Sequence, residues 1–191
     1  SIFKRWNNAV GEGRHVVVVS SGDPGVFAMA SAVFEAVETG PLSWRELDIT
    51  VLPGITAMLA AAARLGAPLG HDFCVINLSD NLKPWSIIET RLRLAVEADF
   101  AMAFYNPRSK ARPEGFEKAL DLLKCACEKE RLIMFARAVS TPEESLHTVH
   151  LSDAKPDMAD MRTMVLLGSR QTRLIPRKNA APIVYTPRSI R

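Results

Sequence analysis

A run of four valines ends abruptly on the turn sequence Gly-Asp-Pro-Gly at 22–25 and leads into a helix-like stretch. Continuous β-branched runs are typical of strands that are covered on both faces in a parallel sheet. We therefore expect a strand over 15–20 and a helix over 26–39. A second copy follows, with a strand over 48–52, a Pro-Gly turn and an alanine-rich helix that ends at Gly66. Two consecutive units of this kind predict an α/β fold with a parallel sheet and helices on its faces.

The rest of the chain continues this alternation of strands and helices. Pro68 and Gly70 interrupt it and predict a domain boundary near residue 70. We expect an N-terminal α/β domain over 1–70, a C-terminal α/β domain over 71–170 and a basic tail over 171–191. The elements expected beyond the boundary are strands over 73–78, 99–107, 131–139 and 162–169, helices over 85–98 and 114–129, and a short segment over 147–154.

The first fifteen residues have the pattern of the end of an amphipathic helix that stops at Gly11 or Gly13. An α/β chain that opens in the middle of such a unit is expected to have lost a strand upstream. We therefore expect the first domain to be truncated at its N-terminus.

The composition is that of a globular protein, because 48% of the 191 residues are hydrophobic, which is enough for a full core. The net charge of +3, from 24 basic and 21 acidic residues, is too balanced for a dedicated nucleic-acid binder. No apolar run approaches the ~20 residues needed to span a bilayer, so we expect no membrane partner. Basic residues gather near the C-terminus, where a solvated tail is the simplest interpretation: Arg170, Arg173, Arg177, Lys178, Arg188 and Arg191.

The three cysteines, Cys74, Cys125 and Cys127, are an odd number without a paired spacing. A Cys-x-Cys sequence alone lacks the further ligands that a zinc site needs, and the histidines lack ligand spacing as well. We therefore expect reduced thiols, a cytoplasmic location and no bound metal.

Ligands of open α/β sheets bind outside the carboxyl ends of the strands, which makes four loops candidates for chemistry: 20–25, 53–57, 104–109 and 137–144. In the first loop, glycines allow a close backbone approach, and free N–H groups at a helix start can hold an anion. Asp23 argues against a phosphate, since a carboxylate accepts hydrogen bonds from ribose hydroxyls or from an amine. A helix cap is the alternative role for Asp23. The usual phosphate-binding glycine fingerprints are absent.

Other polar residues of these loops admit two interpretations each. Thr56 either caps the following helix or lines the same crevice. His71 beside Asp72 is either a proton-transfer pair or a turn histidine with a local hydrogen bond. Three basic residues either bind acidic groups of a substrate or are merely solvated: Arg108, Lys110 and Arg112.

The order and spacing of the loops resemble the tetrapyrrole (class III) S-adenosylmethionine-dependent methyltransferases. These enzymes carry a GDP loop after a strand, a PGIT or PGIS turn, and a strand that ends in tyrosine. Within the family, five stretches resemble the branch that methylates C-17 of precorrin-3B in cobalamin biosynthesis: VSSGDPGVFAMA, LPGITAMLAAAARLGAPLGHDF, NLSDNLKPW, FYNPRSKAR and DMRT. The resemblance covers nearly everything from Val16 to about Gly168. It departs at the front, where the family begins with a further strand and a glycine-rich loop.

The resemblance implies two α/β/α domains of the tetrapyrrole methyltransferase type, with S-adenosylmethionine held in the cleft between them, and a homodimer. It implies methylation of C-17 with contraction of the ring to precorrin-4 and release of S-adenosylhomocysteine. The cofactor contacts that it implies are Ser21, Gly22, Asp23, Val26, Thr56, Ala57, Asn106, Ala138, Val139 and Thr163. Substrate carboxylates would be bound by Arg108, Lys110 and Arg162. By position, the candidates for the proton transfers of ring contraction are Asp80, Ser79, His71 and Tyr105.

Three other functions stay open. The first is a sibling methyltransferase acting at another ring position, or the cobalt-precorrin-3 enzyme of the anaerobic route. The second is a non-catalytic tetrapyrrole-binding fragment, which binding of S-adenosylhomocysteine would distinguish from an enzyme. The third, a nucleotide-binding oxidoreductase, is weakened by the absent phosphate fingerprint.

Overall fold

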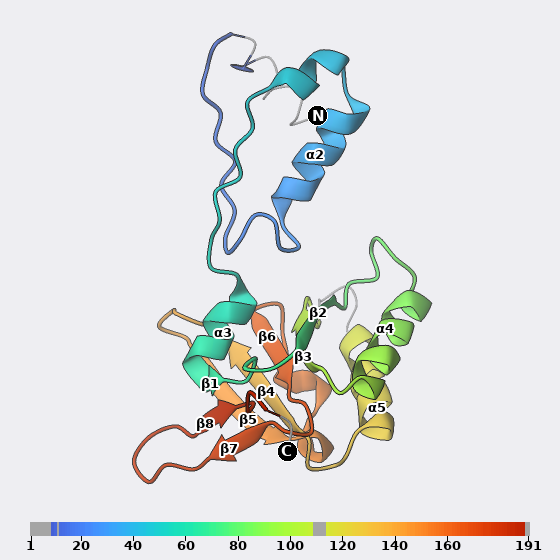
Figure 1. Cartoon of the computed structure of the whole chain (residues 1–191), viewed down its shortest axis with the longest axis vertical. Coiled ribbons are helices and arrows are strands. Elements are labelled where there is room, and N and C mark those ends of the chain that lie inside the picture. Colours follow the sequence, from blue (N-terminus) through green and yellow to red (C-terminus); the bar gives the residue numbers. More distant parts are fainter. Residues whose placement is uncertain (1–8, 11, 109–113, 190–191) are drawn as a thin grey trace. The chain divides into compact units, whose positions relative to one another are not determined.

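A computed structural model describes residues 9–10, 12–108 and 114–189 of the chain. The chain divides into two compact units, residues 1–56 and 57–191 (Figure 1). We expected the boundary near residue 70. It falls earlier because helix α3 (Ala57–Leu65) buries Met58, Ala61 and Leu65 in the core of the second unit.

The first unit contains helix α2 (Met29–Thr39), the 3-10 helix η1 (Leu42–Glu46) and two extended segments. Gly13, with a φ of +73°, ends the preceding helical turn, because its N–H donates to Val10 while the N–H of Arg14 donates to Ala9. This pair of bonds is a Schellman cap. It confirms Gly13, one of the two expected positions, as the end of the helix.

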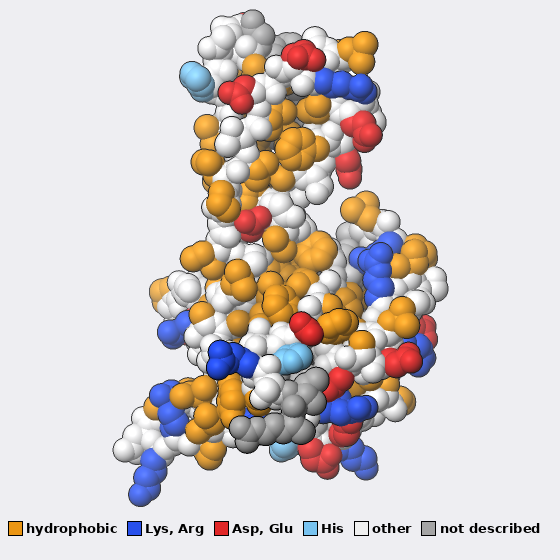
Figure 2. Space-filling view, viewed as in Figure 1, with side chains coloured by type: hydrophobic (Ala, Val, Ile, Leu, Met, Phe, Trp, Pro, Cys, Tyr) orange, Lys and Arg blue, Asp and Glu red, His pale blue; other side chains and the backbone are white. Residues whose placement is uncertain are grey.

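The expected strands over 15–20 and 48–52 are wrong, since neither segment is paired in a β ladder within the described residues. Side chains along the valine run alternate in exposure, with Val16 37% and Val17 80% exposed. All four valines line an apolar cavity of about 590 Å³ together with α2, and apolar side chains gather at the surface of this unit (Figure 2). β-branched residues favour extended backbone, but a strand also needs a hydrogen-bonding neighbour.

The second unit is built on a five-stranded sheet in the order β2-β3-β6-β4-β5. Its strands are β2 (Phe73–Asn77), β3 (Ala101–Tyr105), β4 (Leu132–Arg137), β5 (Ser145–His150) and β6 (Thr163–Leu167). Only β2 and β3 pair in parallel, and the other three pairs are antiparallel. Within this sheet, the expectation of parallel strands therefore holds for one pair alone.

Helices cover both faces of this sheet, as expected for an α/β fold. Helices α4 (Trp85–Glu97) and α5 (Glu114–Ala126) lie over one face and α3 over the other (Figure 1). The alternation along β3 assigns Phe104 to the α4–α5 core and Ala103 to the α3 core. Two short 3-10 helices, η2 (Leu151–Asp153) and η3 (Pro156–Met158), precede β6.

The C-terminal segment forms a second sheet, so a wholly solvated tail is wrong. Strands β7 (Arg173–Ile175) and β8 (Ile183–Tyr185) form an antiparallel pair, and β8 pairs in parallel with β1 (Gly66–Ala67). Val184 is fully buried against α3. A Cβ on Gly66 would lie 2.5 Å from the carbonyl oxygen of Val184, so the glycine permits this close pairing.

No helix among the described residues is both long and apolar enough to cross a membrane.

Candidate functional site

One edge of the five-stranded sheet brings together most of the second unit's predicted site residues. Strands β2, β3 and β4 run in the same direction and β6 runs opposite to them. The carboxyl ends of the first three strands therefore meet the amino end of β6 at one edge, which we call the carboxyl edge. Tyr105 ends β3, Ala138 follows β4 and Thr163 begins β6.

Backbone strain is concentrated at the carboxyl edge. Asn106, Ala138 and Ser140 have φ values of 52°, 48° and 65°, in the left-handed region that side chains disfavour. Such residues persist where their surroundings hold them, and they cluster at ligand-binding sites. The strain points to the same loops that the sequence singled out.

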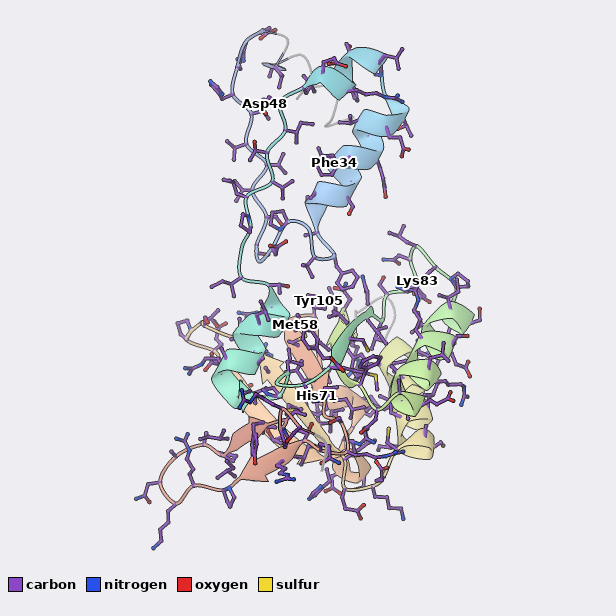
Figure 3. All side chains as sticks on the ribbon, viewed as in Figure 1. Phe34, Asp48, Met58, His71, Lys83 and Tyr105 are labelled. Carbon is purple, nitrogen blue, oxygen red and sulfur yellow. The ribbon has the colours of Figure 1, made fainter. Side chains whose placement is uncertain are left out.

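Tyr105 fastens the start of α3 to the carboxyl edge. Its hydroxyl oxygen accepts a hydrogen bond of 3.1 Å from the N–H of Met58, one of the unpaired N–H groups of the first helical turn (Figure 3). The predicted cofactor residue Ala57 therefore lies at this edge as well. Sequence reasoning had given Tyr105 a proton-transfer role and missed this structural contact.

Asn77, which sequence reasoning missed, organises the loops after β2 and β3. Its side-chain oxygen accepts the N–H of Ser79 at 2.9 Å and the side-chain amide of Asn106 at 3.1 Å. The N–H of Leu78 also donates to the carbonyl of Tyr105 at 2.9 Å. The sequence did offer a signal for Asn77, because it is a polar residue at the end of a strand that lies beside the strand ending in Tyr105.

Asp160 makes the contacts that hold Thr163. The hydroxyl of Thr163 donates a hydrogen bond of 2.7 Å to the carboxylate of Asp160 and accepts one of 3.1 Å from the backbone N–H of Asp160. Arg137 also donates to this carboxylate at 2.7 Å. Partial burial opposes ionisation, but the hydrogen bonds from Thr163 and Arg137 prevail and lower the pKa of Asp160. The hydroxyl of Thr163 is thus engaged within the protein.

Glu144 braces the loop that follows β4. Its carboxylate accepts the N–H of Ser140 at 2.8 Å and a hydrogen bond from Arg64 of α3 at 2.6 Å. The hydrogen bond from Arg64, followed by that from Ser140, lowers the pKa of Glu144. Ala138 and Val139 lie in this braced loop, where Ala138 is buried and Val139 is half-buried.

The four candidates for proton transfer do not all lie together. Ser79 and Asp80 follow β2 at the carboxyl edge, where Tyr105 ends β3. His71 instead precedes β2, at the opposite edge of the sheet (Figure 3), 3.8 Å from the carboxylate of Asp72. The structure therefore does not group His71 with the other three.

Lys83 is a second residue that sequence reasoning missed near Ser79 and Asp80. Its ammonium group donates to the carbonyl of Ser79 at 3.2 Å. Partial burial, followed by the charge of Arg91, lowers the pKa of Lys83, while Asp80 acts in the opposite direction. A cation therefore lies in the loop after β2.

The predicted substrate-binding cations have different surroundings. Arg108 lies 3.5 Å from the carbonyl oxygen of Pro156, at the limit of a hydrogen bond. Arg162 forms an ion pair of 2.7 Å with Glu143. Lys110 and Arg112 lie outside the described residues.

In the first unit, Asp23 clamps two loops together. One of its carboxylate oxygens accepts the N–H of Gly25 at 2.8 Å, and the other accepts the N–H of Gly54 at 3.0 Å. The cap position of α2 is Ala28, so the capping role considered for Asp23 is wrong. Both of its oxygens serve loop geometry.

The other predicted residues of this unit lie along the same clamped loops. Gly22 has a φ of +72°, and a Cβ on Gly54 would overlap its carbonyl oxygen, so the two glycine backbones touch. The N–H of Val26 donates to the carbonyl of Asp23 at 3.2 Å, Ser21 is exposed and Thr56 is buried.

The described residues contain no group of three or more His, Cys, Asp or Glu side chains that could hold a metal ion. The carboxyl edge contains backbone amides, carboxamides, hydroxyls and small apolar side chains, besides the charged groups of Asp80 and Lys83. These groups fit a nucleoside with an amino-acid tail, such as S-adenosylmethionine, whose adenine, ribose and amino-acid groups offer several donors and acceptors.

Comparison with known proteins gives a consistent result. The family described as Tetrapyrrole (Corrin/Porphyrin) Methylases matches residues 1–155. A Sinorhizobium protein described as precorrin-3B C(17)-methyltransferase is 52% identical over 176 residues, which span 92% of this chain and 69% of the relative. A probable cobalt-factor III C(17)-methyltransferase of Salmonella typhimurium is 39% identical over 160 residues, 84% of this chain and 65% of that protein.

A solved structure supports the same relationship. The crystal structure of the methyltransferase CobJ has 61% sequence identity and a TM-score of 0.89, and the match covers 96% of this chain and 74% of that one. Uroporphyrin-III C-methyl transferase from Thermus thermophilus, solved with S-adenosylhomocysteine, has a TM-score of 0.63 at 20% identity, covering 87% of this chain and 71% of that one. At that identity, the second match bears on the fold alone.

Proposed function

Since the chain belongs to the tetrapyrrole (corrin/porphyrin) methylase family, we propose that it methylates C-17 of precorrin-3B with S-adenosylmethionine. The methylation is coupled to contraction of the ring to precorrin-4, a step of cobalamin biosynthesis. The observation that carries the proposal is the 52% identity to the Sinorhizobium C(17)-methyltransferase over 92% of this chain.

The cofactor supplies a reactive methyl group on a positively charged sulfur when it is bound. The protein's own task is then alignment, because a reaction between well-placed partners needs no covalent enzyme intermediate. Loops braced by Asp23 and Asn77 suit that task, since their backbone is held by side-chain hydrogen bonds before any ligand arrives.

The proposed cofactor contacts are the residues that the family resemblance implies. The first unit carries Ser21, Gly22, Asp23, Val26 and Thr56, and the second carries Ala57, Asn106, Ala138, Val139 and Thr163. In this proposal Asp23 and Thr163 act by shaping loops, because their side-chain oxygens are already engaged within the protein.

For the substrate, we propose that Arg108, Lys110 and Arg162 bind its acidic side groups, with Arg162 exchanging Glu143 for a substrate carboxylate. Ser79, Asp80 and Tyr105 remain proposed proton-transfer residues at the carboxyl edge. His71 is the weakest of the four, because it lies at the opposite edge of the sheet.

A cobalt-containing substrate is the second candidate. The Salmonella relative is described as a cobalt-factor III enzyme, and its 39% identity to this chain is the observation that favours this reading. The higher identity to the precorrin-3B enzyme favours the metal-free substrate.

We also propose a cytoplasmic homodimer. All three cysteines are free, and burial raises the pKa of the Cys74 and Cys127 thiols, so these two are poor nucleophiles. Free thiols are typical of a reducing compartment. Sedimentation equilibrium of the purified chain would test the dimer.

The test of function is a methyl-transfer assay with precorrin-3B or cobalt-factor III and S-adenosylmethionine that carries carbon-13 in its methyl group. We expect the label at C-17 of precorrin-3B, located by NMR of the product. Label at another ring carbon would indicate a sibling enzyme. Failure to transfer label to either substrate, together with failure to bind S-adenosylhomocysteine, would contradict a methyltransferase.

A further inference from the structure

Asn77 and Asn106 lie next to each other at the carboxyl edge. Asn77 ends β2 and is paired in register with Tyr105, the last residue of β3. Asn106 follows at once and adopts a left-handed backbone with a φ of 52°, which asparagine tolerates better than most residues. The register of two parallel strands therefore brings the two side chains together.

The hydrogen bonds determine which way both carboxamides point. The N–H of Ser79 can only donate, so the Asn77 atom that it meets at 2.9 Å is the acceptor oxygen. The Asn106 atom 3.1 Å from that same oxygen must then be a donor, which makes it the Asn106 nitrogen. The oxygen of Asn106 therefore points away from Asn77.

The Asn106 oxygen is available to a ligand. Asn106 is exposed, and within the described part of the chain no hydrogen bond to its side-chain oxygen is recorded. An amide oxygen held in this orientation accepts a hydrogen bond and repels another acceptor. It suits any hydrogen-bond donor of a ligand, whether an N–H or an O–H group.

We infer that Asn77 is a positioning residue, which fixes the Asn106 carboxamide so that its oxygen accepts a hydrogen bond from a donor group of the bound cofactor. This inference rests on the proposed function, in which Asn106 contacts S-adenosylmethionine. Three kinds of donor on that molecule have the required chemistry: the exocyclic amine of adenine, the ribose hydroxyls and the ammonium group of the methionine tail.

The test compares Asn77→Leu with Asn77→Asp by calorimetric titration with S-adenosylhomocysteine. The leucine has a similar shape but accepts no hydrogen bond, so Asn106 is free to turn over. We expect about a tenfold loss of affinity, the scale of one or two neutral hydrogen bonds. The aspartate accepts both hydrogen bonds, so we expect an affinity within about twofold of the wild type.

Asn81→Leu is the matched control on the same loop, since only the backbone N–H of Asn81 has a recorded hydrogen bond within the described residues. A general disturbance of this loop would affect Asn81→Leu as well. Thermal unfolding of each variant checks that it is folded. In turnover, Asn77→Leu is expected to raise the KM for S-adenosylmethionine and leave the KM for the tetrapyrrole unchanged.

Two analogues identify the donor. S-inosylhomocysteine lacks the adenine amine, and 5′-methylthioadenosine lacks the amino-acid tail. The penalty of Asn77→Leu should vanish with the analogue that lacks the amine bound by Asn106, and it should persist with both analogues if a ribose hydroxyl is the donor. No penalty with S-adenosylhomocysteine itself, or an equal penalty in Asn81→Leu, would overturn the inference. Absence of S-adenosylhomocysteine binding to the wild type would instead overturn the proposed function.

Discussion

Side-chain oxygens that accept backbone N–H groups are the recurring device in the loops of the candidate site. Asp23 holds Gly25, Asn77 holds Ser79, and Asp160 holds Arg162 at 2.9 Å. Each of these three is a bond to the backbone two residues further on, which mimics a backbone turn and fixes the loop locally. Residues of these types attract attention as ligand contacts, yet here they shape the backbone.

Replacing Asp23 by alanine should weaken binding of S-adenosylhomocysteine by about 1–3 kcal/mol, because two backbone N–H groups lose a charged acceptor. Asp23→Asn keeps only one acceptor oxygen and should fall between the wild type and the alanine variant. Calorimetric titration measures both. Glu46→Ala, which removes an exposed carboxylate of the same unit, is the control and should bind as the wild type does. Unchanged affinity in Asp23→Ala would show that the clamp is dispensable.

The position of Asp23 could be predicted from the sequence, but its role could not. The turn around it is local, whereas the bond to Gly54 joins residues 31 positions apart. Asn77 was missed for the same reason. Its importance comes from the register of β2 on β3, which no local pattern specifies.

At the scale of secondary-structure elements, an ion network around Arg131 links the elements that end or begin at the edge opposite the carboxyl edge. Its side chain is 1% exposed and lies 2.7 Å from Glu128 and 3.2 Å from Asp99. It also donates to the carbonyl of Gly168 at 3.1 Å, and Arg170 pairs with Glu128 at 2.7 Å. The network joins the ends of α5, β3, β4 and β6, so it fastens the sheet away from the site.

Removal of the buried guanidinium by Arg131→Met should lower the free energy of unfolding by about 3 kcal/mol. This is the low end of the range for breaking a buried ion pair, because both carboxylate partners are partly solvated. Urea unfolding measures the change. Arg93→Met, which breaks an exposed ion pair on α4, is the control and should cost no more than about 0.5 kcal/mol.

The same network predicts an acid-dependent stability. The hydrogen bond from Arg131 lowers the pKa of Glu128 to about 2 from an ordinary value of 4.5. A depressed carboxyl pKa contributes stability above pH 4.5 that is lost as the pH falls toward 2. The difference in Tm between the wild type and Glu128→Gln should therefore shrink as the pH falls through this range. A difference that stays constant from pH 6 to pH 2.5 would contradict the assignment.

The C-terminal hairpin should contribute to stability through one residue above all. Val184→Ala removes methyl groups from a fully buried position against α3 and should cost about 2 kcal/mol of the free energy of unfolding. Leu174→Ala on the partner strand β7 is the control. Since Leu174 is 37% exposed, that change should stay within about 0.5 kcal/mol. Equal effects in urea unfolding would show that the hairpin is not anchored through Val184.

The sequence predicted the longer elements of the second unit, because their patterns are local. Helices α4 and α5 and strands β2, β3, β4 and β6 lie within the expected ranges. Strands β1, β7 and β8 have only two or three residues each, and β1 exists through pairing with β8 over more than a hundred positions, while β7 and β8 form a hairpin. Patterns of composition do not report such pairing.

At the scale of the whole molecule, burial is unequal between the two units. All hydrophobic residues that are buried in the described chain lie from Met58 onward. The first unit contains apolar residues of the kinds that form a core, yet its valines and the apolar face of α2 line the cavity of about 590 Å³. A cavity wall lacks the contacts that a packed interior provides. The valine run predicted a strand that is buried on both faces, but in this unit the valines are exposed.

This inequality predicts a difference in local stability that hydrogen exchange can measure. Amides of β3, β4 and β6, whose inner residues are fully buried, should exchange only through global unfolding. Amides of residues 14–20 and 47–55 lack ladder partners in the described structure and should exchange at least about tenfold faster. Mass spectrometry of peptides from the two units, taken from the same sample, gives the comparison directly. Equal protection in both units would mean that the first unit is packed as tightly as the second, and the cavity would then be closed in solution.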